Sequence, residues 1–220
     1  MKQISFKSYL DKEIGLYVHD TADVISFEIE RDKRWFEHEL LEHIANEHRF
    51  HGVIVDVGAN IGNHSKFFME YLVFQRMICV EPHVTNYNIL RANTSGDERV
   101  ELVRAACGAQ PGECGLVSLL DRNYGMVKCA QGTGTKIVTV DDLCGGYHER
   151  VTLLKIDVEG DEVAVLQGAW RTLTTHRPMV YAEACSLDDL HKLMECLDSF
   201  NYTCTKFIDK RNPMFEFTPR

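Results

Sequence analysis

Residues 53–63 read VIVDVGANIGN, an apolar run that leads directly into Gly58, Asn60 and Gly62. An apolar run followed by spaced glycines indicates a buried strand that turns sharply into a helix. Glycine also lets the backbone approach a ligand closely, because it has no Cβ. Glu81 closes the next apolar run, 23 residues after Gly58. An acid about 20 residues after such a loop binds a ribose hydroxyl in doubly wound sheets, so the pair predicts a nucleoside-containing cofactor.

The charge at the end of this first strand distinguishes between cofactors. A dinucleotide site has the spacing G-x-G-x-x-G and rests pyrophosphate on a helix N-terminus, whereas residues 58–63 read GANIGN. Asp56 would repel a phosphate but attract the ammonium and sulfonium groups of S-adenosylmethionine, which has no phosphate. We therefore predict S-adenosylmethionine and disfavour NAD. The alternative for Asp56 is a cap of the following helix.

Length and composition restrict the class of protein. The chain has 220 residues, of which 45% are hydrophobic, enough for one sizeable core. We expect one domain over residues 51–220, with residues 1–50 as an extension that packs on the core or covers the site. A net charge of −9 argues against broad binding to nucleic acid or anionic membranes. With no long apolar run and no signal-peptide pattern, we predict a soluble, cytoplasmic protein.

Cysteine and histidine spacing predicts no metal site. The eight cysteines are scattered and form no C-x-x-C motif, which favours reduced, mostly structural thiols. His38, His43, His48 and His51 do not share an acid at a helical ligand spacing. We expect these histidines to lie on a solvated helix face.

From residue 52 onward, strand-like and helix-like patterns alternate, which predicts parallel βαβ units and an α/β fold. The expected strands are 52–57, 76–81, 98–107, 151–157 and 178–184, with two closing strands within 202–217. Helices are expected at 62–73 and 84–94, after residue 160 and after the capping box at Ser186.

Two segments lie outside this alternation, one before it and one within it. Residues 16–30 show strand-like alternation, and residues 32–48 carry apolar side chains at helical spacing. Residues 113–140 contain three strand-like runs between glycine-rich turns, which predicts an inserted hairpin or antiparallel ribbon. Trp170, in the helix after the fourth strand, is predicted to pack in the core.

Ligands of open α/β sheets bind beyond the carboxyl ends of the strands. The polar residues at those ends are therefore the candidate site: Asp56, Glu81, Ala106 with Cys107, Asp157 with Glu159, and Glu183. Several carboxylates in one crevice are costly unless cations or hydrogen-bond donors offset them. A doubly cationic cofactor is one such offset and a metal ion is another.

Four ordered motifs resemble a known family: VDVGANIGNHSKFF, VEPHVTNYNILRAN, VTVDDL and LLKIDVEGDEVAVLQGAW. They are similar to the FkbM-type S-adenosylmethionine-dependent methyltransferases, over roughly residues 50–185 and a tail that reads NPMFEF. The resemblance implies the class I, Rossmann-like methyltransferase fold: a mostly parallel seven-stranded sheet with helices on both faces and an antiparallel last strand. It also implies methylation of a hydroxyl on a sugar, polyketide or other small molecule.

The resemblance also implies roles for residues. The glycine loop would hold the methionine end of the cofactor, Glu81 the ribose, and residues 157–160 would face the transferred methyl group. The predicted cofactor-binding residues are Asp56, Gly58, Ala59, Asn60, Gly62, Asn63, Glu81, Pro82, Ala106, Cys107 and Asp157.

Methyl transfer to a hydroxyl requires alignment of the reactants and removal of a proton. Asp157 and Glu159 are the candidate base and acceptor-orienting residue, although Glu159 is equally suited to cap the next helix. Lys155 shares a strand face with Asp157 and could neutralise it. Glu183 could orient the acceptor or form a salt bridge. His64 more simply belongs to the first turn of a helix than to the chemistry.

Three other functions compete with an O-methyltransferase. They are a non-catalytic cofactor-binding or scaffold protein, an RNA-modifying methyltransferase, which the acidic charge disfavours, and a nicotinamide oxidoreductase, which the glycine spacing disfavours. Selectivity for a small-molecule or glycan acceptor would come from the front segment, the 113–140 ribbon or a partner subunit, so an oligomer is compatible with the sequence.

Overall fold

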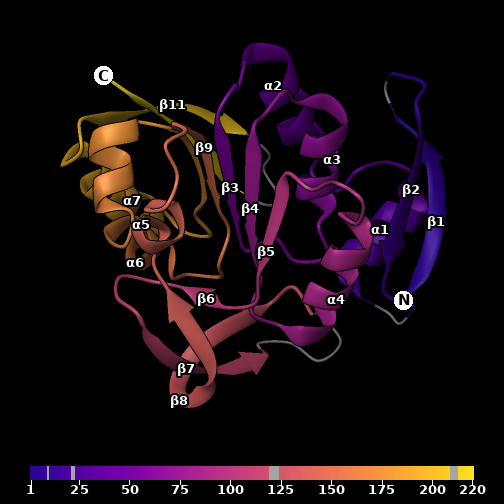
Figure 1. The fold of residues 1–220 in the computed structure, drawn as a ribbon, viewed down its shortest axis with the longest axis horizontal. Coiled ribbons are helices and arrows are strands. Elements are labelled where there is room, and N and C mark those ends of the chain that lie inside the picture. Colours follow the sequence, from indigo (N-terminus) through magenta and orange to yellow (C-terminus); the bar gives the residue numbers. More distant parts are fainter. Residues whose placement is uncertain (9, 21–22, 119–123, 209–212) are drawn as a thin grey trace.

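A seven-stranded sheet organises the chain (Figure 1). The structure is a computed structural model and describes residues 1–8, 10–20, 23–118, 124–208 and 213–220. The strand order is β11-β12-β10-β9-β3-β4-β5. The bounds are β3 (Val53–Val57), β4 (Arg76–Val80), β5 (Val100–Val103), β9 (Val151–Ile156), β10 (Met179–Glu183), β11 (Tyr202–Ile208) and β12 (Met214–Pro219). β12 is antiparallel to both neighbours, while the pairs among β5, β4, β3, β9 and β10 are parallel. The predicted alternation and antiparallel closing strand are confirmed.

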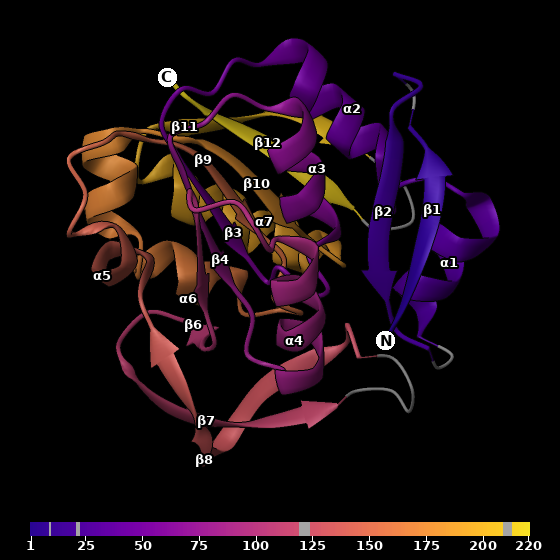
Figure 2. The same cartoon turned by 45° about the vertical axis from the view of Figure 1, so that its right-hand side comes forward.

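Helices cover both faces of this sheet (Figures 1 and 2). One face carries α2 (His38–Glu47), α3 (Asn63–Tyr71) and α4 (Val84–Asn93), and the other carries α5 (Val140–Cys144), α6 (Glu162–Gln167) and α7 (Leu187–Asp198). Every residue of β3 is buried, as expected for a parallel strand covered on both sides. Side chains alternate between the faces: Ile54 and Met77 join the α2–α4 core, whereas Val55 and Ile78 join the α5–α7 core.

The front segment is a hairpin followed by a helix. β1 (Lys2–Lys7) pairs with β2 (Glu13–Val18), and α1 (Val24–Asp32) follows. The strand-like prediction for residues 16–30 is therefore wrong over residues 24–30. Asp23 caps α1 by accepting a hydrogen bond from the Ser26 amide, and the helix buries Ser26 and Ile29, three residues apart. Trp35 joins the hairpin to the main core through edge contacts with Phe6 and Phe67.

The predicted inserted ribbon is present, as a three-stranded sheet in the order β6-β8-β7. It consists of β6 (Ala106–Cys107), β7 (Gly112–Ser118) and β8 (Val127–Val138). β7 and β8 pair antiparallel. β8 runs through Gly132 and Gly134 as one strand, where the sequence predicts two strands and a turn. Residues 119–120 of the first predicted strand lie outside the described residues.

Two core and surface predictions are wrong. Trp170 is 59% exposed, while Leu166 and Leu173 are buried. α6 ends at Gln167 and the chain continues into a short π-helix at Thr172–His176, so regular helical spacing does not hold across Trp170. His43 and His48 do not lie on a solvated face, because their side chains are only 11% and 19% exposed.

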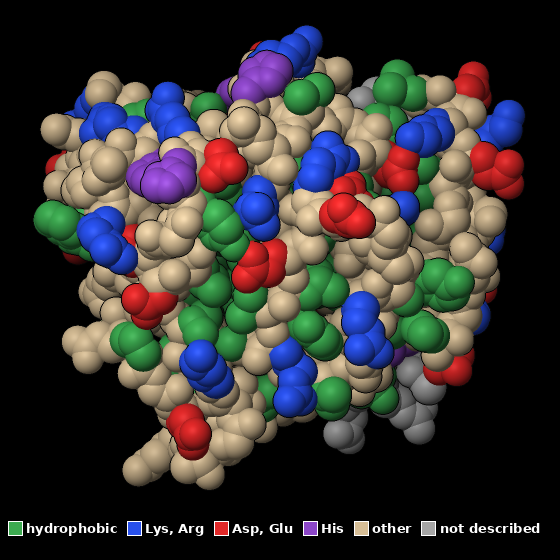
Figure 3. All heavy atoms as spheres, in the orientation of Figure 1, with side chains coloured by type: hydrophobic (Ala, Val, Ile, Leu, Met, Phe, Trp, Pro, Cys, Tyr) green, Lys and Arg blue, Asp and Glu red, His purple; other side chains and the backbone are tan. Residues whose placement is uncertain are grey.

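The surface carries charges of both signs. On the face shown in Figure 3, Lys and Arg side chains are interspersed with Asp and Glu. All eight cysteines belong to the described residues and are free thiols. No helix in the described ranges is long and apolar enough to cross a bilayer.

Candidate active site

A cavity of about 450 Å³ lies at the carboxyl ends of the parallel strands. Its size is within the range of small-molecule and cofactor sites. Residues that end β3, β4, β9 and β10 line it: Val57, Gly58, Val80, Glu81, Asp157 and Glu183. Of the other predicted site residues, Asn60, Pro82, Ala106, Cys107 and Glu159 line the same cavity. The structure therefore places most of the residues predicted from the sequence around one cavity.

Gly58 is required by the packing of two strand ends. Its φ is +76°, and a Cβ there would lie 1.8 Å from the backbone oxygen of Asp157. Gly62 precedes α3 with φ +83°, and a Cβ there would lie 2.7 Å from Leu90. Residues other than glycine adopt these backbone conformations only at an energetic cost. Gly58 thus lets the ends of β3 and β9 approach closely at the cavity, and Gly62 lets α3 begin close to α4.

Glu81 holds the glycine loop in place. One carboxylate oxygen accepts a hydrogen bond from the Asn60 amide (2.9 Å), and the other accepts one from the His83 amide (2.8 Å). Burial raises the pKa of Glu81 to about 7 despite these two bonds, which favour the carboxylate. The side chain is 5% exposed and borders the cavity. It therefore both fixes the loop and faces the space where a ligand would lie.

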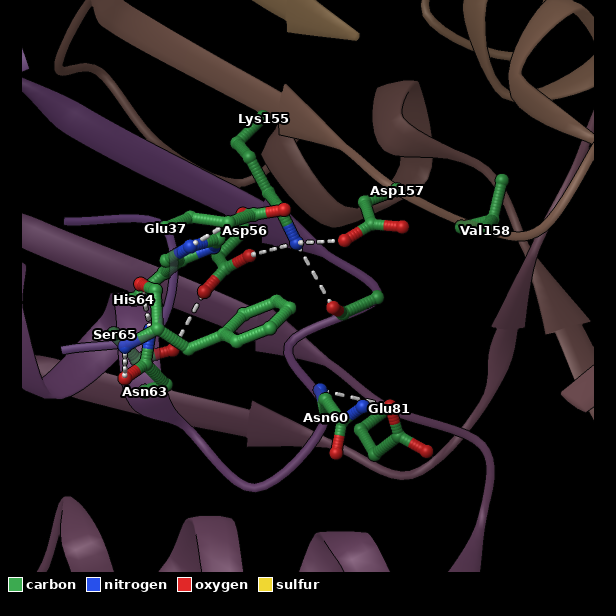
Figure 4. Close-up of polar contacts among 12 residues, drawn as sticks. Glu37, Asp56, Asn60, Asn63, His64, Ser65, Glu81, Lys155, Asp157 and Val158 are labelled. Atoms are coloured by element: carbon green, nitrogen blue, oxygen red, sulfur yellow. Dashed lines mark hydrogen bonds and ion pairs between the residues drawn. The ribbon is translucent and has the colours of Figure 1, made fainter. Parts of the chain in front are cut away.

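Lys155 is the buried cation at the centre of the site (Figure 4). Its Nζ lies 3.3 Å from Asp56, 3.4 Å from Asp157, and donates to the Gly58 carbonyl oxygen at 2.9 Å. Burial would lower the pKa of Lys155, but the Asp56 and Asp157 carboxylates outweigh burial and raise it. The sequence-based interpretation that Lys155 could neutralise Asp157 agrees with this contact.

Asp56 is not among the residues that line the cavity. It is fully buried, contacts Lys155, and its second oxygen accepts a hydrogen bond from the Ser65 hydroxyl (2.6 Å). The Asp56 carboxylate thus forms an internal ion pair that joins β3 to β9, and its contact with a cofactor stays a prediction. The expected repulsion of phosphate by Asp56 is correspondingly offset by Lys155.

Three further loop residues of the predicted set also lie outside the cavity lining: Ala59, Gly62 and Asn63. The Asn63 side chain accepts a hydrogen bond from the Phe36 amide and donates one to the Phe36 carbonyl (3.1 and 3.0 Å). It thereby ties the start of α3 to the front segment. Its role in the structure is to hold that segment against the site.

The turn after β9 directs Glu159 into the cavity. Glu159 has a left-handed φ of +58°, which costs a non-glycine residue energy and often marks a functional position. Glu162, not Glu159, accepts the amide hydrogen bonds of this turn, from Val158 and Gly160. Helix capping therefore does not occupy Glu159. Burial, followed by the nearby Asp157 and Glu162 carboxylates, raises the pKa of Glu159 to about 7.

Glu183 and Glu37 complete the acidic end of the cavity. One oxygen of Glu183 is buried without a hydrogen-bond partner, and burial together with Asp157 and Glu159 raises its pKa. The raised pKa favours the protonated form of Glu183, which can donate a hydrogen bond. Glu37, just before α2, lies 2.9 Å from the His64 Nε2. His64 is behind Glu37 and is not part of the lining.

Several lining residues escaped sequence reasoning. They come from the front segment (Val24, Ile25, Phe36 and Glu37) and from the ribbon (Leu116, Met126, Val127 and Cys129). None belongs to a motif with a known spacing. The one available signal is that both segments lie outside the regular βαβ alternation, and segments that connect or extend the regular elements commonly carry function.

Comparison with known proteins identifies the family. A model described as the methyltransferase FkbM domain matches residues 56–204. A search of curated proteins found no relative of this chain. Among solved structures, a methyltransferase FkbM from Methylobacillus flagellatus KT is 21% identical, with a TM-score of 0.58 over 76% of this chain. The match covers 43% of that protein, so the present chain spans less than half of its length.

Other structural matches are more distant in sequence. TYW2 of M. jannaschii, solved in complex with AdoMet, is 13% identical with a TM-score of 0.55 and covers 99% of this chain and 87% of its own. A putative RNA methyltransferase from Pyrococcus horikoshii is 12% identical with a TM-score of 0.53, covering 93% and 90%. At these identities the matches establish the fold alone. It is the Rossmann-like fold of class I methyltransferases.

Proposed function

Because the chain belongs to the methyltransferase FkbM family, we propose that it transfers a methyl group from S-adenosylmethionine to a hydroxyl of a small-molecule or glycan acceptor. The observation that carries this proposal is the distribution of polar groups around one cavity. Glu81 borders the glycine loop, while Asp157, Glu159 and Glu183 gather on the β9–β10 side. The scattered cysteine spacing, which gives no disulfide framework, supports a reducing compartment such as the cytoplasm.

The residues present fit S-adenosylmethionine. Its ribose hydroxyls need an acceptor such as Glu81, and its two cationic groups need carboxylates that are not already neutralised. Glu159 meets that need, because no ion pair among the described residues holds its carboxylate as Lys155 holds that of Asp56. Apolar lining from Val80, Pro82, Ala106 and Cys107 would suit an adenine ring. Asp56, Ala59, Gly62 and Asn63 would support the loop from outside.

Bound S-adenosylmethionine supplies an electrophilic methyl group with a good leaving group. The chain itself has to orient the acceptor and take its proton. Glu159 suits the second task, because a base with a pKa near 7 is half ionised at neutral pH and still accepts a proton readily. Asp157, whose carboxylate lies 3.4 Å from the Lys155 Nζ, suits the orientation of the acceptor. Glu183 would donate a hydrogen bond to an acceptor oxygen.

Calorimetric titration tests the cofactor. We expect S-adenosylmethionine and its demethylated product to bind and NAD not to bind. Glu81→Ala should weaken binding by about 1.5–3 kcal/mol, typical of a hydrogen bond to a charged group. Glu98→Gln, at an exposed position, is the control and should bind normally. Binding of NAD alone would overturn the assignment.

A methyl-transfer assay with labelled cofactor tests the reaction. The acceptor panel should contain saccharides, phenols, polyketides and RNA. We expect transfer to a hydroxyl-bearing small molecule or glycan. Glu159→Gln should reduce turnover at saturating cofactor by about 10²–10⁴-fold, and it should also weaken cofactor binding because a carboxylate near the cationic groups is lost. Transfer to RNA alone would favour the RNA-modifying function. Cofactor binding with no transfer to any acceptor would favour a non-catalytic protein.

A further inference from the structure

A second cluster of polar side chains lies away from the cavity, where α2 meets the closing strands. His43 on α2 and His48 at its C-terminal end face Glu216 on β12. The His43 and His48 Nε2 atoms lie 2.7 and 3.1 Å from the same Glu216 oxygen, Oε2. The three side chains are 11%, 19% and 7% exposed. None of them lines the cavity described above.

The cluster places too many donors on one oxygen. The Tyr181 hydroxyl, on the strand next to Glu216 and in register with it, also donates to Oε2 at 2.7 Å. A carboxylate oxygen offers two lone pairs, yet three donors converge on this one. If a cation replaced the two imidazole protons, both rings would become ligands, and the crowding of protons around Oε2 would be relieved.

The arrangement also meets the geometric needs of a small metal site. One ring nitrogen from each histidine and one Glu216 oxygen all lie within 4.8 Å of one another. The two imidazole planes are at 88°, so the rings approach Oε2 from different directions. A zinc ion about 2.0–2.2 Å from each ligand atom would therefore need only small side-chain adjustments.

A hydrogen bond to the second oxygen of Glu216 also supports a metal site here. The Thr205 hydroxyl donates to the other Glu216 oxygen, Oε1, at 2.6 Å, and Thr205 lies at a bulge where the β11–β12 register shifts. Bulges re-aim side chains, and partners behind a metal ligand fix its orientation. The Glu216 carboxylate is thus held with Oε2 toward both histidines.

We propose that His43, His48 and Glu216 form a binding site for a divalent transition-metal ion, with Zn²⁺ the best match. Two imidazole nitrogens and one carboxylate suit borderline ions such as Zn²⁺, whereas Mg²⁺ and Ca²⁺ prefer all-oxygen ligands. The ion would join α2 to the closing strands. Because Glu37 precedes α2 and lines the cavity, the same ion would steady one wall of the active site.

Lys206 competes with this ion. Its Nζ lies 3.1 Å from the His43 Nδ1, and because an ammonium only donates, the ring proton then sits on Nε2. Metal binding through Nε2 needs that proton on Nδ1 instead, which Lys206 opposes. Lys206 is exposed, so its side chain can leave. Removal of Lys206 should therefore strengthen metal binding.

Calorimetry on the chelator-treated full chain tests the site with Zn²⁺, and with Mg²⁺ as the comparison ion. We expect one Zn²⁺ per chain, a raised melting temperature and no response to Mg²⁺. His43→Gln and Glu216→Gln should weaken Zn²⁺ binding about 10-fold or more, and Lys206→Met should tighten it. His51→Gln and Cys185→Ser, at exposed positions, should leave the affinity unchanged.

The same experiment can overturn the proposal. Absence of stoichiometric Zn²⁺ binding by the unaltered chain would do so, because the hydrogen-bonded cluster would then be complete without a metal. Loss of binding in Cys185→Ser would assign the ion to a thiol, as would the strong near-ultraviolet band that thiolates give with Co²⁺. If His43→Gln or Glu216→Gln does not fold, the exposed Lys206→Met variant decides, and an unchanged affinity there counts against the site.

Discussion

Replacing Lys155 with methionine should destabilise the protein strongly. The Lys155 ammonium is 2% exposed and lies between Asp56, which is fully buried, and Asp157. Methionine fills similar space but leaves the Asp56 carboxylate buried without its cation. Breaking one side of a buried ion pair costs about 3–5 kcal/mol, a large share of the roughly 5–15 kcal/mol that stabilises a typical domain. Hydrophobic packing of the methionine offsets little of this, because the charge that remains is the dominant cost.

Urea unfolding of three variants measures this effect. Lys155→Met alone should lose about 3–5 kcal/mol, and Lys155→Met with Asp56→Asn should recover much of the loss, because the unpaired buried charge is then gone. Lys192→Met, which breaks an exposed pair with Asp188, is the control and should cost about 0–1 kcal/mol. The reasoning is refuted if Lys155→Met costs less than about 1 kcal/mol, or if the double variant is no more stable than the single one.

Three further outcomes are expected. Gly58→Ala should abolish folding or cofactor binding, because the added Cβ would meet a backbone oxygen. Gly96→Ala has the same sign of φ but open space around it, so it should cost only about 1–2 kcal/mol of unfolding free energy. Equal losses of stability and cofactor affinity in the two variants would argue against this. With a pKa of about 7, Glu159 is about half protonated at pH 7, and a bound cation favours its carboxylate form. Cofactor binding at pH 7 should therefore release up to about half a proton. Calorimetry in buffers of different ionisation enthalpy measures this release, and proton uptake would contradict it. Trp170→Ala should change the unfolding free energy by less than about 1 kcal/mol, because Trp170 is exposed. Leu166→Ala, at a buried position, should lower it by about 2–5 kcal/mol. A loss for Trp170→Ala as large as that for Leu166→Ala would mean that the Trp170 side chain is buried in solution.

The central sheet was predictable because its signals are local. Continuous apolar runs such as Val53–Val57 identify strands that are buried on both faces. Acids at the ends of those strands, Glu81 and Asp157, had to meet at one sheet edge once the strands were parallel. The resemblance to a family added the order of the motifs to this argument. Fold class and most of the cavity floor follow from these features.

Features that depend on tertiary contacts were not predictable. The 16–30 segment suited strand alternation, but the Asp23 cap and the packing of Ile29 favour a helix after Val18. The Lys155 ammonium reaches Asp56 only once β3 and β9 pair, so no local pattern predicts this ion pair. His43 finds Glu216 across 173 residues of chain. Spacing rules do not predict the Asp56 and His43 contacts, whereas the Asp23 cap is a local signal that the strand-like alternation masks.

The ribbon and the central sheet differ in how firmly they are held. β3 is buried throughout, whereas β7 and β8 have many half-buried or exposed residues and join the short strand β6. Segments with few buried contacts open at a lower free energy than the core. Backbone amides of β8 should accordingly exchange with deuterium well before those of β3. We expect the ribbon wall of the cavity, at Met126 and Val127, to open locally and widen the entrance. The strand ends that form the opposite side should stay in place.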